Sequence, residues 1–130
     1  MIVVDTSAWI EFLRDTGSAV CEAVDRLLGT DLAICDAISM EVLAGARDER
    51  HLAQLRGLLD TVTMLPTTPE HYDSAAALYR QCRRSGESVR KLVDCLIAAV
   101  AVDFDAEVLH ADADFAVLAR HTDLRVYTLA

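Results

Sequence analysis

The chain has 130 residues, of which 53% are hydrophobic, and a formal net charge of -9. This length predicts a single domain over residues 1–130 with enough apolar side chains for a core. The apolar runs are too short to cross a bilayer, and residues 1–5 lack the positive segment of a secretory leader. The negative charge argues against indiscriminate binding of nucleic acid, because a polyanion is normally held by lysine and arginine.

The cysteines predict a reduced compartment. Cys21, Cys35, Cys82 and Cys95 are dispersed and lie within apolar stretches, without the paired spacing of zinc sites or thiol redox motifs. We expect them to be reduced core residues, which favours the cytoplasm over an oxidising compartment.

Short apolar strands and amphipathic helices alternate along the chain. A strand at Ile2–Val4 leads to Asp5 and a helix, for which Thr6 and Ser7 are candidate capping residues. The elements expected after it are a helix at 19–28, a strand at 32–35, a helix that carries Glu41 and ends near Gly45, a helix at 48–59, a strand at 62–65, a helix from Thr68 to about Arg84, a helix from about Ser88 to Val102, a strand at 107–111, a helix at 115–120 and a strand at 125–128. This alternation predicts an α/β fold, a three-layer α/β/α sandwich with a mostly parallel sheet.

Acidic residues follow two of the expected strands. Asp5 comes directly after the first strand, and Asp112 and Asp114 follow a late one. Ligands of an open parallel sheet gather at the carboxyl ends of its strands, so these acids share a candidate binding edge. The alternative is that they only cap the helices that follow.

Asp94 is surrounded by apolar residues along its helix, from Val93 to Val102. A helix that is apolar on every side is buried. A buried carboxylate needs a cation or a basic partner, because an isolated charge is costly away from water. The partner is either a metal ion or Arg90, four residues before.

Glu41 and Thr6 have a weaker basis in the sequence. Glu41 has apolar neighbours, which is compatible with an inward position, although glutamate is usually solvated. Thr6 can add a hydroxyl to the site or simply cap its helix.

Converging carboxylates repel one another unless a cation neutralises them. Oxygen ligands with little histidine or cysteine nearby favour Mg²⁺, or Mn²⁺, over zinc. One or two such ions would activate water for a phosphodiester displacement. A second enzyme class, a phosphatase with an aspartate nucleophile, usually has another acid two residues on, where this chain has Ser7.

Basic residues gather just before Asp94. Eleven of the twelve are arginine, and five fall in one short window: Arg80, Arg83, Arg84, Arg90 and Lys91. They can guide a phosphate backbone or form a solvated helix face.

Four segments, in order and spacing, resemble the PIN-domain nucleases and, among them, the VapC toxins of bacterial toxin-antitoxin pairs. These segments are Val3 to Ala8, Glu41, Asp94 to Ala99, and Asp112 to Phe115. The resemblance covers nearly the whole chain.

This resemblance implies a PIN-like fold and a Mg²⁺-dependent or Mn²⁺-dependent endoribonuclease, the toxin of a toxin-antitoxin pair, that cleaves RNA by metal-activated water. Asp5, Glu41, Asp94 and Asp112 would be catalytic metal ligands, and Asp114 would ligate the metal directly or support its ligands. It also implies a homodimer silenced by a VapB-like antitoxin, often through an arginine that enters the acidic site.

Two points stay open in the sequence. The family often has threonine or serine two residues before the fourth acid, and here His110 takes that place. Its side chain can hydrogen-bond a carboxylate or the substrate, or it can have a structural role alone. A catalytically silent PIN-like module that binds RNA or protein is the alternative function, as is a metal bound only for stability.

Overall fold

The computed structural model describes residues 1–129, which form five strands and seven helices. The sheet has the order β3-β2-β1-β4-β5, and each neighbouring pair is parallel. The predicted α/β/α sandwich is confirmed. In chain order the elements are β1 (Ile2–Val4), α1 (Thr6–Leu13), α2 (Ala19–Leu27), β2 (Leu32–Cys35), α3 (Asp36–Ala44), α4 (Glu49–Leu59), β3 (Thr63–Leu65), α5 (Pro69–Arg84), α6 (Leu92–Asp103), β4 (Glu107–Leu109), α7 (Ala113–His121) and β5 (Arg125–Val126).

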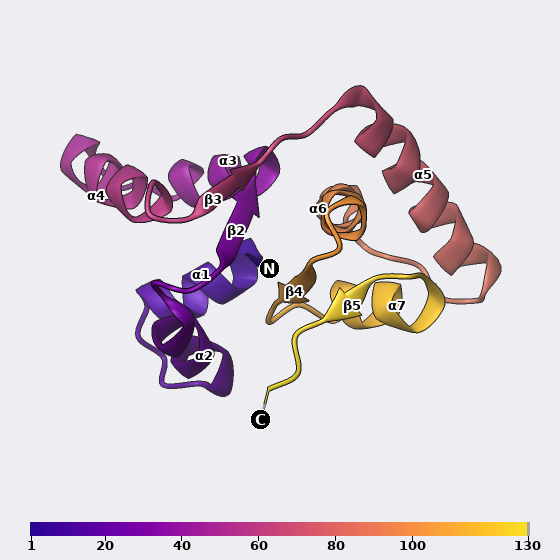
Figure 1. Ribbon diagram of the computed structural model, residues 1–130, viewed down its shortest axis with the longest axis horizontal. Coiled ribbons are helices and arrows are strands. Elements are labelled where there is room, and N and C mark those ends of the chain that lie inside the picture. Colours follow the sequence, from indigo (N-terminus) through magenta and orange to yellow (C-terminus); the bar gives the residue numbers. More distant parts are fainter. Residues whose placement is uncertain (130) are drawn as a thin grey trace.

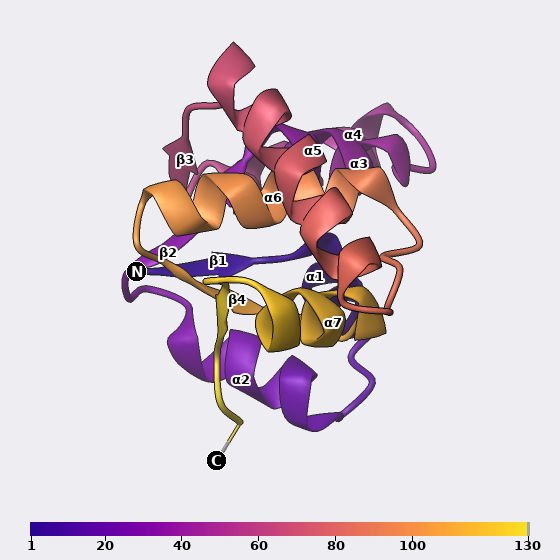
Figure 2. The ribbon, with the colours of Figure 1, turned by 90° about the vertical axis from the view of Figure 1, so that its right-hand side faces the viewer.

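Helices cover both faces of the sheet. Figures 1 and 2 show α1 and α2 on one face and α5 and α6 on the other. The first layer continues through α3, which contacts α1, and α4, which contacts α3; α7 contacts both α5 and α6 and belongs to the second layer. The core lies between these layers, and Trp9, Phe115 and Ile97 are among its largest fully buried side chains.

The sheet reverses its direction of growth at β1. The chain adds β2 and β3 on one side of β1, and then returns to place β4 on the other side. Val4, the last residue of β1, is in register with Leu109, the last residue of β4. A crevice forms outside the carboxyl ends of strands at such a switch point, so the fold directs Asp5 and the residues after β4 to one place.

Several expected boundaries are wrong, and tertiary hydrogen bonds account for two of them. The helix expected from Ser88 begins at Leu92, since the backbone N–H groups of Arg90 and Lys91 donate to the Asp114 carboxylate instead of joining a helix. The strand expected at 107–111 ends at Leu109, and the Ala111 N–H donates to the Ser7 hydroxyl. The strands expected at 62–65 and 125–128 are also shorter, at Thr63–Leu65 and Arg125–Val126.

Two other expectations about the chain can be compared with the structure. The four cysteines are buried free thiols, as predicted. Among residues 1–129, helices long and apolar enough to cross a bilayer are absent.

Candidate active site

Asp5 stands where β1 ends and α1 begins. Its backbone N–H donates to the Leu109 carbonyl at 3.0 Å, which joins it to the end of β4. Its Oδ2 accepts from the backbone N–H of Ser7 at 3.0 Å and from the Ser7 hydroxyl at 2.6 Å. Asp5 itself, and not Thr6 or Ser7, is therefore the N-cap of α1.

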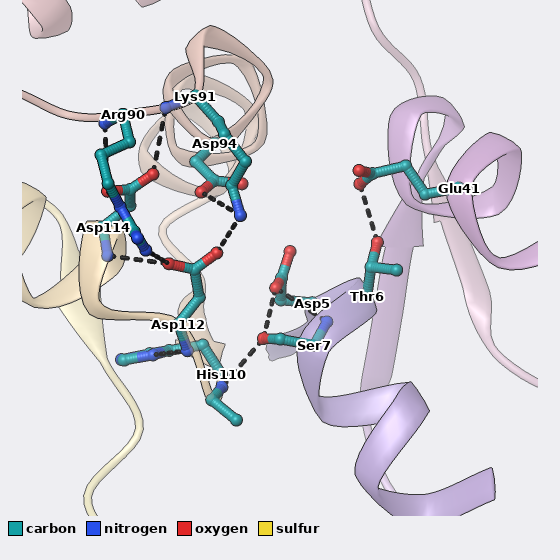
Figure 3. A network of polar contacts seen from close by, with 11 residues as sticks. Asp5, Thr6, Ser7, Glu41, Arg90, Lys91, Asp94, His110, Asp112 and Asp114 are labelled. Atoms are coloured by element: carbon teal, nitrogen blue, oxygen red, sulfur yellow. Dashed lines mark hydrogen bonds and ion pairs between the residues drawn. The ribbon is translucent and has the colours of Figure 1, made fainter.

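Ser7 links the two strand ends and was not recognised as a site residue from the sequence. Its hydroxyl donates to Asp5 and accepts from the Ala111 N–H at 2.9 Å. It thereby orients Asp5 against the turn that carries Asp112 (Figure 3). The signals in the sequence were its place two residues after a candidate ligand and within the segment Val3 to Ala8 that carries the resemblance.

Asp112 and Asp114 lie at the start of α7. Asp112 is the N-cap, and its Oδ1 accepts from the Asp114 N–H at 2.9 Å. Asp114 is only 2% exposed. Its two carboxylate oxygens accept from the backbone N–H groups of Arg90 and Lys91, each at 3.1 Å. Asp114 thus joins α7 to the start of α6.

Asp94 lies in the first turn of α6 and is 3% exposed. The alternative of an ion pair with Arg90 is wrong, because the Arg90 side chain reaches Asp114 and Asp112 instead, at 3.3 and 3.5 Å. The nearby cation is Lys91, whose Nζ lies 3.5 Å from Asp94 Oδ2. Burial, followed by the hydrogen bond with Asp114 and the charges of Asp5 and Asp112, raises the pKa of Asp94 to about 8.

Three of the acids form a tight group. Carboxylate oxygens of Asp94, Asp112 and Asp114 lie within 4.8 Å of one another, and Asp5 faces this group across a short gap (Figure 3). Asp5 Oδ1 and Asp94 Oδ2 are buried and accept no hydrogen bond. Buried carboxylate oxygens without donors are costly, and a hard divalent cation is the group that such oxygens bind. The residues present therefore fit a Mg²⁺ or Mn²⁺ ion.

Glu41 approaches from the other side of Asp5. It is half-buried on α3, and its Oε1 accepts from the Thr6 hydroxyl at 2.8 Å. Figure 3 shows this pair apart from the three-acid group, with Asp5 between them. Thr6 therefore holds Glu41 and does not cap α1.

His110 follows β4 and packs on Phe115, with ring centroids 5.3 Å apart. Its Nδ1 accepts from the Asp112 N–H at 3.2 Å. Burial lowers the pKa of His110 despite the neighbouring charges of Asp5 and Asp112. In this structure the side chain supports the turn that carries Asp112.

The expected basic cluster divides into two parts. Arg90 and Lys91 lie at the acids, where Lys91 contacts Asp112 (Figure 3). Arg80, Arg83 and Arg84 are exposed on the last turns of α5, and the Arg83 guanidinium lies 5.7 Å from the centroid of the Tyr79 ring.

Comparison with known proteins identifies the family. Residues 2–121 match the model of the PIN domain. The chain belongs to the PIN-domain family. Relatives of this chain include ribonuclease VapC11 of Mycobacterium tuberculosis, which is 43% identical over 129 residues and is matched over 96% of each chain. Ribonuclease VapC51 of the same organism is 32% identical over 121 residues, which cover 87% of this chain and 88% of the relative.

A solved structure shows the same PIN fold. The crystal structure of VapBC2 from Rickettsia felis, bound to a DNA fragment from its promoter, matches 98% of this chain and 98% of the other with a TM-score of 0.77 and 16% identity.

Proposed function

We propose that the chain is the toxin of a toxin-antitoxin pair and an endoribonuclease that depends on Mg²⁺ or Mn²⁺. The relatives named as ribonucleases support cleavage of RNA. The observation that carries the metal dependence is the pair of buried carboxylate oxygens without a hydrogen-bond donor, on Asp5 and Asp94.

Asp5, Asp94 and Asp112 would hold the ion. Asp5 and Asp94 supply the two unpartnered buried oxygens, and a carboxylate oxygen of Asp112 lies within 4.8 Å of one of Asp94. A bound divalent ion supplies activation of water and stabilisation of the charge that develops on the phosphodiester. Glu41 completes the ligand set from the opposite side, together with the Thr6 hydroxyl that orients it. Asp114 acts by positioning, since its oxygens already accept from two backbone N–H groups.

The remaining residues orient these ligands and receive the RNA. Ser7 fixes Asp5, and the Asp114 contacts fix the first turn of α6, on which Asp94 lies. Arg80, Arg83 and Arg84 on α5, together with Arg90, offer positive charge for the phosphate backbone.

Cleavage of assorted RNAs in Mg²⁺ or Mn²⁺ tests this function. We expect cleavage by the wild type, loss of at least about a hundredfold for Asp5→Ala and Asp94→Asn, and little change for Asp25→Asn, which removes an exposed acid on α2. Equal cleavage by the wild type and both site variants would refute the assignment. Metal binding without cleavage would favour the catalytically silent binding module.

A VapB-like antitoxin is the proposed protein partner, and the cytoplasm the proposed compartment. The solved VapBC2 complex supports the first assignment. The acid group already accommodates a cationic side chain, that of Lys91, so a partner's arginine can enter it as well. Co-expression with the small open reading frame beside the toxin gene should give a complex that does not cleave RNA. Failure of the two proteins to form a complex would refute the proposed partner.

We also propose a homodimer, formed over an apolar groove between α3, α5 and α6. Met40, Tyr72 and Leu92 line it and are 62%, 61% and 62% exposed. Large exposed apolar side chains that gather in one groove are typical of protein interfaces. We expect a dimer by light scattering at micromolar concentration, and a monomer for Met40→Asp with Leu92→Asp. A monomeric wild type would contradict the proposal.

A further inference from the structure

Lys91 is the only lysine in the sequence, while the other eleven basic residues are arginines. It immediately precedes α6, as the N-cap residue, three positions before Asp94. Its side chain is 51% exposed along its length, but its ammonium group enters the acid group. The one lysine of this chain therefore lies at the group formed by Asp94, Asp112 and Asp114.

The ammonium group bridges two of the proposed metal ligands. It contacts Asp112 Oδ2 and lies 3.5 Å from Asp94 Oδ2 (Figure 3). The side chains of these two acids are only 9% and 4% exposed. Asp94 Oδ2 accepts no hydrogen bond, so at 3.5 Å the contact is electrostatic, and the oxygen is left free for a better ligand.

Arg90 shares only Asp112 with Lys91 and contacts it in a different way. Its guanidinium reaches Asp114 and Asp112 from the exposed side, and its side chain is 71% exposed. A guanidinium is a planar fork, whereas an ammonium is a compact point charge and is closer in shape to a metal ion. The hydrogen bond to Asp112 raises the pKa of Lys91 above its usual value, so the group stays charged.

We propose that Lys91 is a built-in cation that neutralises Asp112 and occupies the position beside Asp94 when no divalent ion is bound, and that it competes with the ion for these two side chains. This inference rests on the proposed metal dependence. Binding of the ion then requires the Lys91 ammonium to leave Asp94 and Asp112. Lys91 thereby reduces the repulsion among the acids of the metal-free site. It also lowers the affinity for the ion, because the ion must displace the ammonium group.

Metal affinity of variants tests the competition without measuring RNA cleavage. We expect isothermal titration with Mn²⁺ to give a dissociation constant about tenfold lower for Lys91→Met than for the wild type. Arg90→Met is the matched control, because it removes one positive charge from Asp112 and Asp114 without vacating the position between Asp94 and Asp112. We expect it to change the dissociation constant by no more than about threefold.

Because the lysine is unique, its movement can be followed directly. Reductive methylation with ¹³C-formaldehyde labels only the Lys91 amine and the amine of Met1. The Met1 amine lies 3.3 Å from Asp31 Oδ2 and outside the acid group. Dimethylation keeps the positive charge of both amines. On addition of Mg²⁺ we expect the Lys91 signal to shift toward that of a free dimethyl-lysine and the Met1 signal to stay in place.

The outcomes separate this inference from the function on which it rests. Mn²⁺ binding together with an immobile Lys91 signal, or with equal affinities of the Lys91→Met and Arg90→Met variants, would overturn the competition and leave the metal site standing. Absence of Mn²⁺ binding to both the wild type and Lys91→Met would overturn the metal site and the competition together. Tighter binding by Lys91→Met with a shifted Lys91 signal supports both.

Discussion

The acids of this site are held in unequal ways at the scale of single residues. Asp5 has one oxygen with two donors from Ser7 and one oxygen with none. Asp114 has both oxygens occupied by backbone N–H groups. A carboxylate oxygen that already accepts hydrogen bonds holds its donors in place. A buried carboxylate oxygen that accepts none is available to a cation.

Ser7→Ala tests the positioning of Asp5. Loss of the hydroxyl removes its bond to Asp5 and leaves the Ala111 N–H without its acceptor. We expect the free energy of unfolding to fall by about 1–2 kcal/mol and the Mn²⁺ affinity to fall by about tenfold. Urea denaturation and isothermal titration measure the two effects. Ser74→Ala, at an exposed position of α5, is the control, and equal behaviour of the two variants would contradict the role of Ser7.

The raised pKa of Asp94 predicts how stability depends on pH in the metal-free chain. Between its ordinary value of 3.8 and about 8, the folded chain holds a proton on Asp94 that the unfolded chain has released. Stability therefore falls as pH rises through this window, by at most about 1.4 kcal/mol per pH unit.

Asp94→Asn isolates this contribution, because the other titrating groups are common to both proteins. We expect the difference in unfolding free energy, variant minus wild type, to grow from about pH 4 to about pH 8 in the presence of a chelator. His110, whose pKa is lowered, contributes stability that is lost as pH falls, in both proteins alike. A difference that does not vary with pH would show that Asp94 is ionised throughout.

At the scale of elements, the start of α6 depends on another helix. The N-cap residue Lys91 makes no capping bond with its own side chain, and the N–H groups before the first turn donate to Asp114 of α7. A carboxylate at a helix N-terminus also interacts favourably with the helix dipole. The position of Asp94 is therefore set by α7 as well as by α6.

Asp114→Ala should accordingly destabilise the chain even without metal. Two backbone N–H groups and the Arg90 side chain lose their buried acceptor, so we expect a loss of about 2–4 kcal/mol in urea denaturation with a chelator present. Asp114→Asn keeps one acceptor and should lose less. A loss that appears only when metal is added would identify Asp114 as a direct ligand instead.

At the scale of the whole molecule, the net charge of -9 must be reconciled with a polyanionic substrate. The acids that fit a cation account for part of that charge, and the arginines of α5 lie on the segment that leads into the site. The proposed attraction to RNA is therefore local, to the metal and to this arginine surface, while the rest of the molecule repels the substrate.

Replacing Arg83 and Arg84 together with alanine tests this arginine surface. We expect weaker RNA binding. We also expect a shallower slope of the logarithm of the binding constant against the logarithm of salt concentration, by the equivalent of up to about two phosphate contacts. Fluorescence anisotropy with labelled RNA at several salt concentrations measures the slope. Arg50→Ala, at an exposed position on α4, should leave the slope unchanged. If the double variant has the same slope as the wild type, α5 does not contact the RNA.

The sequence by itself determined the layered fold, because alternating strands and helices admit few packings. It also determined that Asp5 and Asp112 lie at one edge of the sheet, because the carboxyl ends of parallel strands point the same way. It also determined that Asp94 is buried, since the apolar run around it predicts a buried helix, and the residues from Asp94 to Ala101 are indeed buried.

Only the tertiary structure decided which donors reach which acids. Ser7 contacts Ala111 across 104 residues of sequence, and Thr6 reaches Glu41 across 35. The late start of α6, the pairing of Arg90 with Asp114 and the entry of Lys91 among the acids depend on α7 packing beside α6. The direction of a side chain toward a distant partner is set by packing, so spacing along the chain does not contain it.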